Sequence, residues 1–482
     1  MNLLLLSHEI LVLVLGLGLL LVDLWLPLDA KRKLGYTAAA GLIVVFVYSL
    51  LAIPCGAPTQ YAFGQMYVLD GLALFFKRFF LIAAAIVLVM SVEFADRIEA
   101  GIAEFYALLL FALTGMLFAA SANNFALLFV SLELITVTFY VLVSFQRARV
   151  RSLEAGVKYL IIGALSTAFT VFGIALVSGL SRTLDFATLA GVAGRYAINP
   201  IFVFGLGLVL VGLGFKIAAF PFQIWAPDVY QGAPAPVTAF LAVGSKAAGF
   251  VLLLRVLFAA VPSVTKDWAN LLIIISAISI LYGNLCAIPQ RNLKRLLGYS
   301  SIAHAGYLLL GIAALSESGQ AAVLYYLSGY LFTVLAAFAV ICVALRQVDG
   351  EDIGALAGLH QRSPLLASTM TLAMASLAGI PPLAGFFGKF LLLKAVIEHG
   401  PMNHGYYCVA FTALAGVVIS LYYYFGVVRA MYWSGEAKDL SPIPVSLPIR
   451  ITLYSCIAGM FYLGMFPNAM VNLATGAVRC LR

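Results

Sequence analysis

Apolar runs long enough to cross a membrane recur along the whole chain, and they constrain its fold more than any other feature of the sequence. A spanning α-helix needs about 20 predominantly apolar residues. Runs of this kind, bounded by charged residues or by Gly and Pro, lie near 3–28, 36–53, 71–92, 104–121, 123–145, 152–179, 200–222, 236–261, 269–288, 297–314, 321–345, 364–399, 406–431 and 450–474. The sequence therefore predicts an all-α integral membrane protein with about 14 transmembrane helices.

The composition excludes several other classes. Hydrophobic residues make up 63% of the chain and charged residues only 10%, whereas a soluble domain carries roughly 25% charged residues. The net charge of +8 does not indicate nucleic-acid binding, because no Lys/Arg cluster with interleaved aromatic residues lies on a soluble module. The run at 3–28 lacks a basic n-region and an A-x-A-like cleavage site, so we expect it to remain as the first span in the lipid bilayer.

The basic residues between the runs predict the orientation in the membrane. The odd-numbered connections carry Lys31, Arg32, Lys33, Arg97, Arg147, Arg149, Arg151, Arg291, Lys294, Arg295, Arg346, Arg362, Arg429, Lys438 and Arg450, and the even-numbered ones carry Arg182, Arg195 and Lys266. Cytoplasmic loops are enriched in Lys and Arg. We therefore expect the odd connections to be cytoplasmic and both termini to lie on the non-cytoplasmic side, although Arg479 and Arg482 run against the bias.

No cofactor or metal site is expected in this chain. Cys55, Cys286, Cys342, Cys408, Cys456 and Cys480 form no C-x-x-C or Cys/His cluster, which predicts small buried hydrophobes rather than a zinc or iron–sulfur centre. The sequence has no G-x-x-x-x-G-K-[ST] phosphate loop, and its glycine-rich stretch GLGLVLVG at 205–212 lies inside a span, where glycines serve close helix packing.

Charged residues inside the runs are the candidates for function. Lys77, Arg78 and Arg255 lie within about two turns of a run end, so we expect them to snorkel to the interface. Glu133 lies near the centre of the fifth run, where a carboxylate is costly unless it faces a partner or water. In an antiparallel hairpin, residues equally far from the turn lie at one depth, and the midpoint of positions 133 and 158 falls at Phe145/Gln146. This spacing predicts that Glu133 and Lys158 meet.

The same argument applies to the later runs. The midpoint of Lys216 and Lys246 is Gln231, so these lysines should lie opposite one another at depth. His304 lies about 14 Å into the tenth run at 1.5 Å per residue. Lys389 lies in the twelfth run, and Lys394 is expected only to pack or snorkel.

Two of the lysine-bearing runs are broken. Pro221 interrupts the seventh run, and Pro381 and Pro382 interrupt the twelfth. Such breaks leave backbone N–H and C=O groups without hydrogen bonds, which lipid cannot supply, so they occur where protein or water surrounds them. When they occupy corresponding positions in two repeats, they indicate a transport site. If residues 104–261 and 269–431 are two five-helix repeats, the broken runs are the fourth helix of each; the N-terminal helices would then lie at 1–103 and a C-terminal helix within 432–482.

These groups together suggest a proton relay. Burial disfavours the charged, protonated form of a lysine, and a nearby carboxylate favours it again. A charge that moves nearby can therefore make the lysine bind or release a proton. We expect Glu133 and Lys158 to form the input pair, Lys216 to be the switched site, Lys246 and His304 to conduct, and Lys389 to be the exit. The alternative is a scaffold whose buried charges only fix helix packing. Moving a proton against the membrane potential costs about 2.3 kcal/mol per 100 mV, so partner subunits or a counter-ion gradient must supply the energy.

Three segments carry a resemblance to a known family. FKIAAFPFQIWAPDVYQGAPAPVTAFLAVGSKAAGF (215–250), LKRLLGYSSIAHAGY (293–307) and GIPPLAGFFGKF (379–390), in this order, resemble the antiporter-like subunits of respiratory complex I, the NADH–quinone oxidoreductase. The resemblance covers nearly the whole chain and is strongest to the N-type branch of the bacterial enzymes. It implies fourteen helices, two inverted five-helix repeats with a broken fourth helix in each, and a central polar axis for protons.

The resemblance also implies roles and partners. Glu133, Lys158, Lys216, Lys246 and Lys389 match the family's glutamate and lysines on helices five, six, seven, eight and twelve, and His304 matches a histidine of the tenth. The chain would translocate protons in the bacterial plasma membrane as part of an enzyme, beside further antiporter-like subunits. NADH, FMN, iron–sulfur clusters and quinone would be bound by partner subunits. A similar alternative is the D-type subunit of multisubunit cation/proton antiporters.

Overall fold

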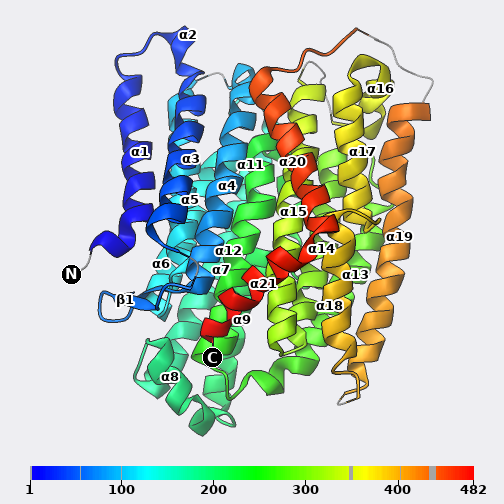
Figure 1. The fold of residues 1–482 in the computed structure, drawn as a ribbon. Helices are drawn as coiled ribbons and strands as arrows, with labels where there is room; N and C mark the ends of the chain where they lie inside the picture. Colours follow the sequence, from blue (N-terminus) through cyan, green and yellow to red (C-terminus); the bar gives the residue numbers. More distant parts are fainter. Residues whose placement is uncertain are drawn as a thin grey trace.

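The computed structural model describes residues 3–54, 56–98, 100–346, 351–401, 403–433 and 441–481. Among these residues, 13 helices are long and apolar enough to cross a membrane. They run side by side, most of them nearly parallel to one axis, as Figure 1 shows. The predicted all-α membrane class is confirmed, and the strands described are one short hairpin of β1 (Gln60–Ala62) and β2 (Tyr67–Leu69).

The spanning helices follow the predicted runs within a few residues at most ends. They are α1 (Ser7–Asp23), α3 (Leu34–Ala52), α4 (Gly71–Phe94), α5 (Ile102–Ala120), α6 (Phe125–Val143), α7 (Val150–Ser181), α9 (Pro200–Ile217), the continuous segment of α11 (Ala235–Phe240), η4 (Leu241–Ser245), α12 (Lys246–Leu254) and η5 (Arg255–Ala260), then α13 (Ala269–Ala287), α14 (Leu293–Ala313), α15 (Glu317–Ala344), α19 (Gly405–Trp433) and α20 (Leu447–Met465). The short elements are η1 (Leu3–Leu6), α2 (Leu28–Lys31), η2 (Ala95–Arg97), α8 (Phe186–Val192), η3 (Ala193–Tyr196), α10 (Trp225–Gly232), η6 (Thr265–Trp268), η7 (Ile353–Leu356), α16 (Leu359–Arg362), α17 (Pro364–Ala378), α18 (Ala384–Ile397), α21 (Pro467–Val478) and η8 (Arg479–Leu481).

The seventh and twelfth runs are both broken in the structure. Helix α9 ends where Ala218 takes a left-handed conformation (φ 56°), and α17 ends where Gly379 does (φ 90°). The prolines follow within four residues in each case, and they cannot continue a helix because they lack the N–H group. The twelfth run is therefore two short helices, α17 and α18, which together with the 13 spans account for the fourteen predicted runs.

One local arrangement occurs at the start of the second helix in each predicted repeat. The side chain of Asn124 caps α6 by accepting a hydrogen bond from the Leu127 N–H, and Asn292 caps α14 in the same way. Each asparagine also forms an isolated β-bridge with an aspartate, Asn124 with Asp185 and Asn292 with Asp352. The two halves of the chain thus share a feature that the sequence periodicity did not indicate.

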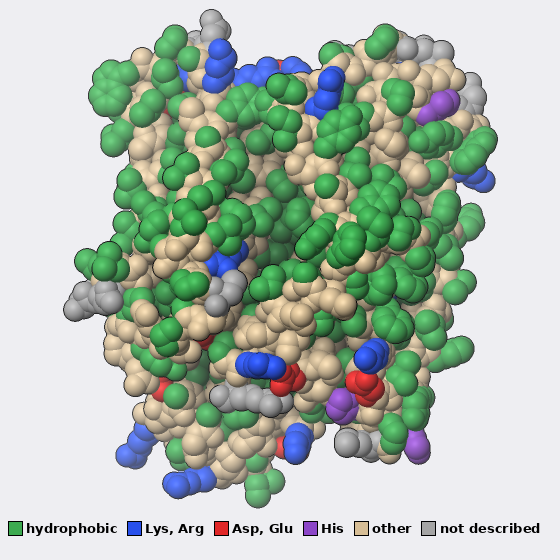
Figure 2. All heavy atoms as spheres, in the orientation of Figure 1, with side chains coloured by type: hydrophobic (Ala, Val, Ile, Leu, Met, Phe, Trp, Pro, Cys, Tyr) green, Lys and Arg blue, Asp and Glu red, His purple; other side chains and the backbone are tan. Residues whose placement is uncertain are grey.

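The bundle has an inner layer and an outer layer. At least 94% of the residues in the most apolar part of each inner segment are buried; these segments are Ala235–Ala260, Leu293–Ala313 and Glu317–Ala344. In the outer helices α1, α3, α7, α19 and α20, the corresponding share of buried residues is at most 39%. Most charged side chains on the face shown in Figure 2 gather near its two ends, and hydrophobic side chains dominate between them. In Figure 1, α2 and α16 lie at one end of the bundle, and the hairpin, α8 and both termini lie toward the other. Lys438 and Arg482 of the predicted charge bias lie outside the described residues.

Candidate functional site

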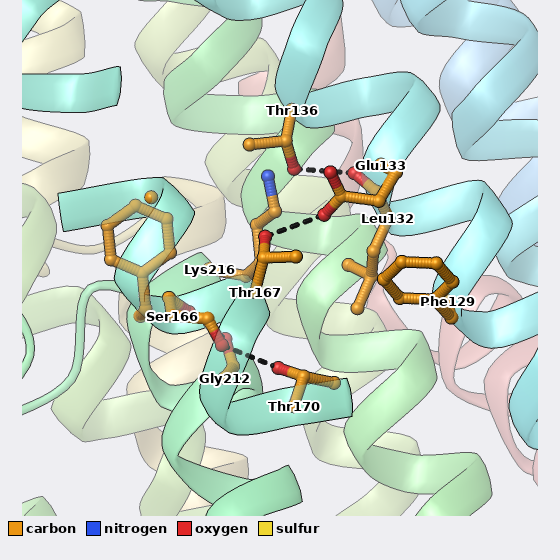
Figure 3. A pocket seen from close by; sticks show the side chains of 11 residues that line it. Phe129, Leu132, Glu133, Thr136, Ser166, Thr167, Thr170, Gly212 and Lys216 are labelled. Carbon is orange, nitrogen blue, oxygen red and sulfur yellow. Dashed lines mark hydrogen bonds between the residues drawn. The ribbon is translucent and has the colours of Figure 1, made fainter. Parts of the chain in front are cut away.

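Glu133 and Lys216 line one small cavity between α6, α7 and α9. Glu133 lies at the centre of α6, as predicted, and Lys216 lies in the last turn of α9 with only 6% of its surface exposed. Figure 3 shows the Lys216 ammonium pointing toward the Glu133 carboxylate and the hydroxyl of Thr136. The cavity has a volume of about 10 Å³, close to that needed by a single water molecule. The Lys216 ammonium has no hydrogen-bond partner within the described part of the chain.

The predicted contact between Glu133 and Lys158 is wrong. Glu133 accepts a hydrogen bond of 2.7 Å from Thr167, nine positions further along α7. The reason is the register of the hairpin: the Ser152 hydroxyl donates to the carbonyl of Val143, so the first turn of α7 already lies level with the end of α6. The turn formed by residues 144–149 is therefore not symmetric about Phe145/Gln146, the midpoint used for the prediction. As a result, Lys158 lies closer to the end of the hairpin than predicted.

Lys158 instead pairs with Asp228, which is not among the predicted site residues. The Lys158 Nζ atom lies 2.7 Å from Asp228 Oδ2 and 2.7 Å from a carboxylate oxygen of Glu154. On its other side, Asp228 lies 2.5 Å from the guanidinium of Arg295. Asp228 is the single acidic residue between positions 200 and 261, directly after the broken run, and this signal could have identified it.

Asp228 joins the two halves of the chain through opposite charges. It lies on α10, in the connection between two spans, and it links Lys158 of α7 to Arg295 of α14. Burial opposes the ionisation of Asp228, but hydrogen bonds from Lys158 and Arg295 outweigh it and hold the pKa of this carboxyl below its usual value. Lys158, Asp228 and Arg295 thus form a partly exposed charged cluster at the edge of the bundle.

If the proton relay predicted from the sequence operates, Asp228→Asn should slow it several-fold while the protein still assembles. The substitution removes the charge between two cations, but half-exposed ion pairs contribute only about 0–1 kcal/mol each, so the fold should persist. The measurement is proton uptake by membrane vesicles, normalised to the amount of protein in the membrane. Glu154→Gln is the matched control, because it removes the other, more exposed partner of Lys158 and should leave uptake near normal. Equal rates for both variants would contradict a special role for Asp228.

Lys246 lies close to Lys216 in the fold but faces another neighbour. A Cβ atom at Gly249 would lie 3.1 Å from the Cβ of Lys216, so Lys216 packs one helical turn from Lys246. The Lys246 ammonium donates to the carbonyl of Ser301 at 2.6 Å and also to its hydroxyl. It lies 5.3 Å from the centre of the Tyr330 ring, within the range of a cation–π interaction.

His304 continues this polar path among tyrosines. Its Nδ1 lies 2.5 Å from the hydroxyl of Tyr326 and its Nε2 lies 3.0 Å from that of Tyr424. The Tyr424 hydroxyl lies 2.5 Å from that of Ser300, and the ring of Tyr330 lies 5.2 Å from that of His304. A count of hydrophobic residues does not reveal these tyrosines, because it includes tyrosine among the apolar types although the tyrosine hydroxyl can both donate and accept.

Lys389 ends the path at the second broken helix. Its ammonium donates to the carbonyls of Leu377 (2.8 Å) and Ala378 (3.1 Å), the last two residues of α17, and lies 5.0 Å from the Tyr307 ring. The C-terminus of a helix carries a partial negative charge that stabilises a cation. Lys216 precedes its break and Lys389 follows its own, yet Lys216 lies in the last turn of α9 and the Lys389 ammonium reaches the last turn of α17.

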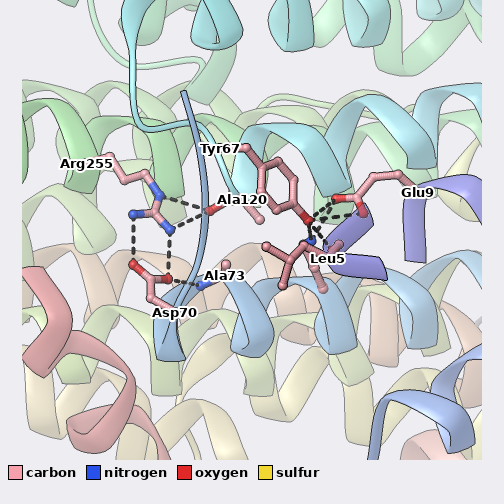
Figure 4. A network of polar contacts seen from close by, with 8 residues as sticks. Leu5, Glu9, Tyr67, Asp70, Ala73, Ala120 and Arg255 are labelled. Atoms are coloured by element: carbon pink, nitrogen blue, oxygen red, sulfur yellow. Dashed lines mark hydrogen bonds and ion pairs between the residues drawn. The ribbon is translucent and has the colours of Figure 1, made fainter. Parts of the chain in front are cut away.

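Snorkelling is the wrong description of Lys77 and Arg255. Lys77 is fully buried, lies 2.7 Å from Glu9 and also donates to the Tyr67 hydroxyl. Figure 4 shows Glu9 and Tyr67, together with Arg255 and its partner Asp70. Arg255 makes two hydrogen bonds, of 3.1 and 2.9 Å, to Asp70. The carboxylates that stabilise these cations come from other elements, and position along a run does not reveal them.

The other charges and the cysteines follow the expectations only in part. Arg78 is partly buried and donates to backbone carbonyls at Ser49 and Ile53, whereas Lys394 is exposed beside Glu398. Cys342 and Cys456 are buried as predicted, but Cys408 is exposed, Cys286 and Cys480 are partly buried, and Cys55 lies outside the described residues. Within the described ranges, no group of three or more His, Cys, Asp or Glu side chains could hold a metal ion.

Comparison with known proteins gives a consistent result. Residues 122–419 match the family described as the transmembrane region of NADH:quinone oxidoreductase and Mrp antiporters. The chain is 39% identical over 483 residues to subunit N of the NADH-quinone oxidoreductase of Heliobacterium modesticaldum, with 100% of both chains covered. This agrees with the resemblance to the N-type branch.

Solved structures show the same fold. A chain of respiratory complex I from Thermus thermophilus is 34% identical, with a TM-score of 0.80, and the match covers 97% of this chain and 99% of that one. A chain of the Mrp complex from Dietzia sp. matches with a TM-score of 0.84 over 100% of this chain and 98% of that one. Its sequence identity of 20% supports only a shared fold.

Proposed function

Because the chain belongs to the family of NADH:quinone oxidoreductase and Mrp antiporter transmembrane subunits, we propose that it translocates protons as a membrane subunit of an NADH–quinone oxidoreductase, respiratory complex I. The enzyme's redox chemistry would take place in partner subunits that hold NADH, FMN, iron–sulfur clusters and quinone. Other antiporter-like subunits are its expected neighbours in the bilayer. No cofactor is assigned to this chain.

One observation carries this proposal. A row of ionisable groups runs through the most buried part of the bundle, from Lys216 through Lys246 and His304 to Lys389, each no more than 6% exposed. Charged groups at membrane depth are costly and usually mark an ion or proton path. A scaffold would need only enough polar contacts to fix the packing, and the free ammonium of Lys216 makes no such contact within the described chain.

The geometry supports a revised order of roles. Lys158, with Asp228 and Arg295, forms the charged group at the edge of the bundle, while Glu133 faces Lys216 at the first broken helix. Lys246 and His304 connect this pair to Lys389 through Ser301 and the tyrosines. We propose that Lys216 is the site whose proton is gained and lost as nearby charges move, and that Lys389 is the exit.

We also propose the repeat organisation and the orientation predicted from the sequence. The repeats would be 104–261 and 269–431, inverted with respect to one another, between N-terminal helices in 1–103 and a C-terminal helix in 432–482. The paired bridges of Asn124 with Asp185 and of Asn292 with Asp352 support this division. Bacterial relatives favour the plasma membrane, and the charge bias favours both termini on its non-cytoplasmic side.

The test of the function uses membranes from a strain in which the gene is deleted and then restored. We expect deletion to abolish NADH-driven proton uptake and restoration to recover it. Restoration with Glu133→Gln should return the assembled complex but a clearly slower uptake, because the amide cannot carry the proton. If Glu133→Gln supports uptake at the normal rate, Glu133 has no part in the mechanism.

The cation/proton antiporter alternative is less supported, since its solved relative shows only the fold. It makes a different prediction for the same strain: deletion would lower sodium tolerance and Na⁺/H⁺ exchange while NADH-driven uptake continued. That result would overturn the assignment to complex I.

A further inference from the structure

The carboxylate of Glu133 has one side-chain partner within the described chain, the hydroxyl of Thr167. Thr167 Oγ1 donates to Glu133 Oε1 at 2.7 Å. Glu133 itself is only partly buried, and its neighbours one turn away on α6, Val130 and Val137, are more than half exposed. A glutamate at such a position can turn its carboxylate inward, toward the cavity, or outward, toward the surface of the bundle. The bond to Thr167 selects the inward orientation.

The other hydroxyls around the cavity are bound to the backbone. Thr136 donates to the carbonyl of Leu132 at 2.5 Å, and Thr170 donates to that of Ser166 at 2.9 Å. Ser166 lies 3.5 Å from the carbonyl of Gly212. Figure 3 shows that Thr167 alone of these hydroxyl groups is joined to the carboxylate. It is therefore the group placed to control where the carboxylate points.

The walls of the cavity hold this arrangement in place. A Cβ atom at Gly163 would lie 2.1 Å from the Tyr140 hydroxyl, and one at Gly212 would lie 1.7 Å from Thr170 Oγ1. The glycines thus allow α7 to approach both α6 and α9 closely. With the helices this close, the carboxylate and the ammonium can change places only by rotation of the Glu133 and Lys216 side chains.

We propose that Thr167 is the positioning residue for proton exchange between Glu133 and Lys216, an inference that rests on the function proposed above. By holding the carboxylate at the cavity, Thr167 keeps it opposite the Lys216 ammonium. In the exchange, one proton leaves Lys216 and one is gained by Glu133, directly or through a single water that accepts one proton and releases another. No other species is consumed.

The test compares three variants of the assembled complex in membrane vesicles. Thr167→Val keeps the shape of the side chain and removes the hydroxyl, and we expect it to lower NADH-driven proton uptake about tenfold, the effect of losing one hydrogen bond to a charged group. Thr167→Ser keeps the hydroxyl and should recover most of the rate. Thr138→Val is the matched control, since Thr138 is buried on the same helix as Glu133 but donates only to the carbonyl of Leu134, outside the cavity.

A double variant separates positioning from packing. If Thr167 acts through Glu133, Thr167→Val should have no further effect in a Glu133→Gln background, whereas a packing defect would add to it. Infrared difference spectra of the purified complex give an independent readout: a carboxyl band that Glu133→Gln removes should shift in Thr167→Val and not in Thr138→Val.

The outcomes distinguish the two proposals. If Glu133→Gln slows uptake but Thr167→Val behaves like Thr138→Val, the positioning role is wrong and the proposed function stands. If Glu133→Gln itself leaves uptake unchanged, Glu133 has no part in the mechanism and the inference fails with it. A loss in Thr167→Val that Thr167→Ser does not recover, or that adds to Glu133→Gln, shows a structural role and also overturns the positioning role.

Discussion

Lys216→Ala is expected to reduce NADH-driven proton uptake to less than about one tenth of normal while the complex still assembles. The side chain is buried in the last turn of α9, lines the same cavity as Glu133, and has no hydrogen-bond partner among the described residues. Removing it therefore breaks no hydrogen bond of the ammonium group among the described residues. The measurement is proton uptake in vesicles, with the content of assembled complex determined on a native gel.

Lys394→Ala is the matched control for this experiment. Lys394 is also a lysine of a broken run, but its side chain is 58% exposed beside Glu398 and lies away from the polar path. Its removal should change neither uptake nor assembly. Normal uptake in Lys216→Ala would mean that protons take another route and that the first broken helix has a structural purpose.

Arg255→Ala is expected to have the opposite profile, a large loss of assembled protein. Arg255 and Asp70 are 2% and 3% exposed, and Arg255 also donates to the carbonyl of Ala120 at the end of α5. Removing one member of a buried ion pair leaves the other charge uncompensated, which costs about 3–5 kcal/mol. We expect the content of assembled complex in membranes to fall to a small fraction of normal, measured by native gel and by the melting temperature of the residual protein.

A double variant tests whether the effect comes from the charge. Asp70→Asn with Arg255→Ala should be less destabilised than Arg255→Ala alone, because no carboxylate is then buried without a partner. Arg195→Ala serves as a control, since Arg195 is exposed on η3, directly after α8 in the chain. Equal destabilisation in the single and double variants would assign the loss to packing around the guanidinium instead.

Some of the buried cations could be interpreted from the sequence alone, and others could not. Lys216 and Lys389 were identified because a cation and a proline break lie in one apolar run, which is a local signal. The snorkelling prediction is wrong for Lys77 and Arg255 because their partners, Glu9 and Asp70, lie 68 and 185 positions away along the chain (77 − 9 and 255 − 70). No periodicity connects residues so far apart.

The hairpin of α6 and α7 shows a second kind of limit. The sequence predicted both helices, and it placed Glu133 correctly at the centre of the first. It did not predict which residue faces Glu133, because that depends on how six connecting residues are divided between the helices. Lys158 and Thr167 are separated by two and a half turns of α7, at 3.6 residues per turn. This shift gives the Glu133 carboxylate a neutral hydroxyl as its partner in place of the predicted ammonium group.

The sequence by itself determined the class of protein, the spans, the breaks at Pro221, Pro381 and Pro382, and the ionisable groups that the membrane must accommodate. Each of these follows from local composition, because a segment in lipid must be a continuous apolar helix that satisfies its own backbone hydrogen bonds. A charged residue or a proline inside such a segment is therefore recognised from the sequence alone. The tertiary structure alone decided the partners: Thr167 for Glu133, Asp228 for Lys158, and the end of α17 for Lys389. Partners depend on helix register and on contacts between distant segments, and packing fixes these only when the whole bundle is assembled.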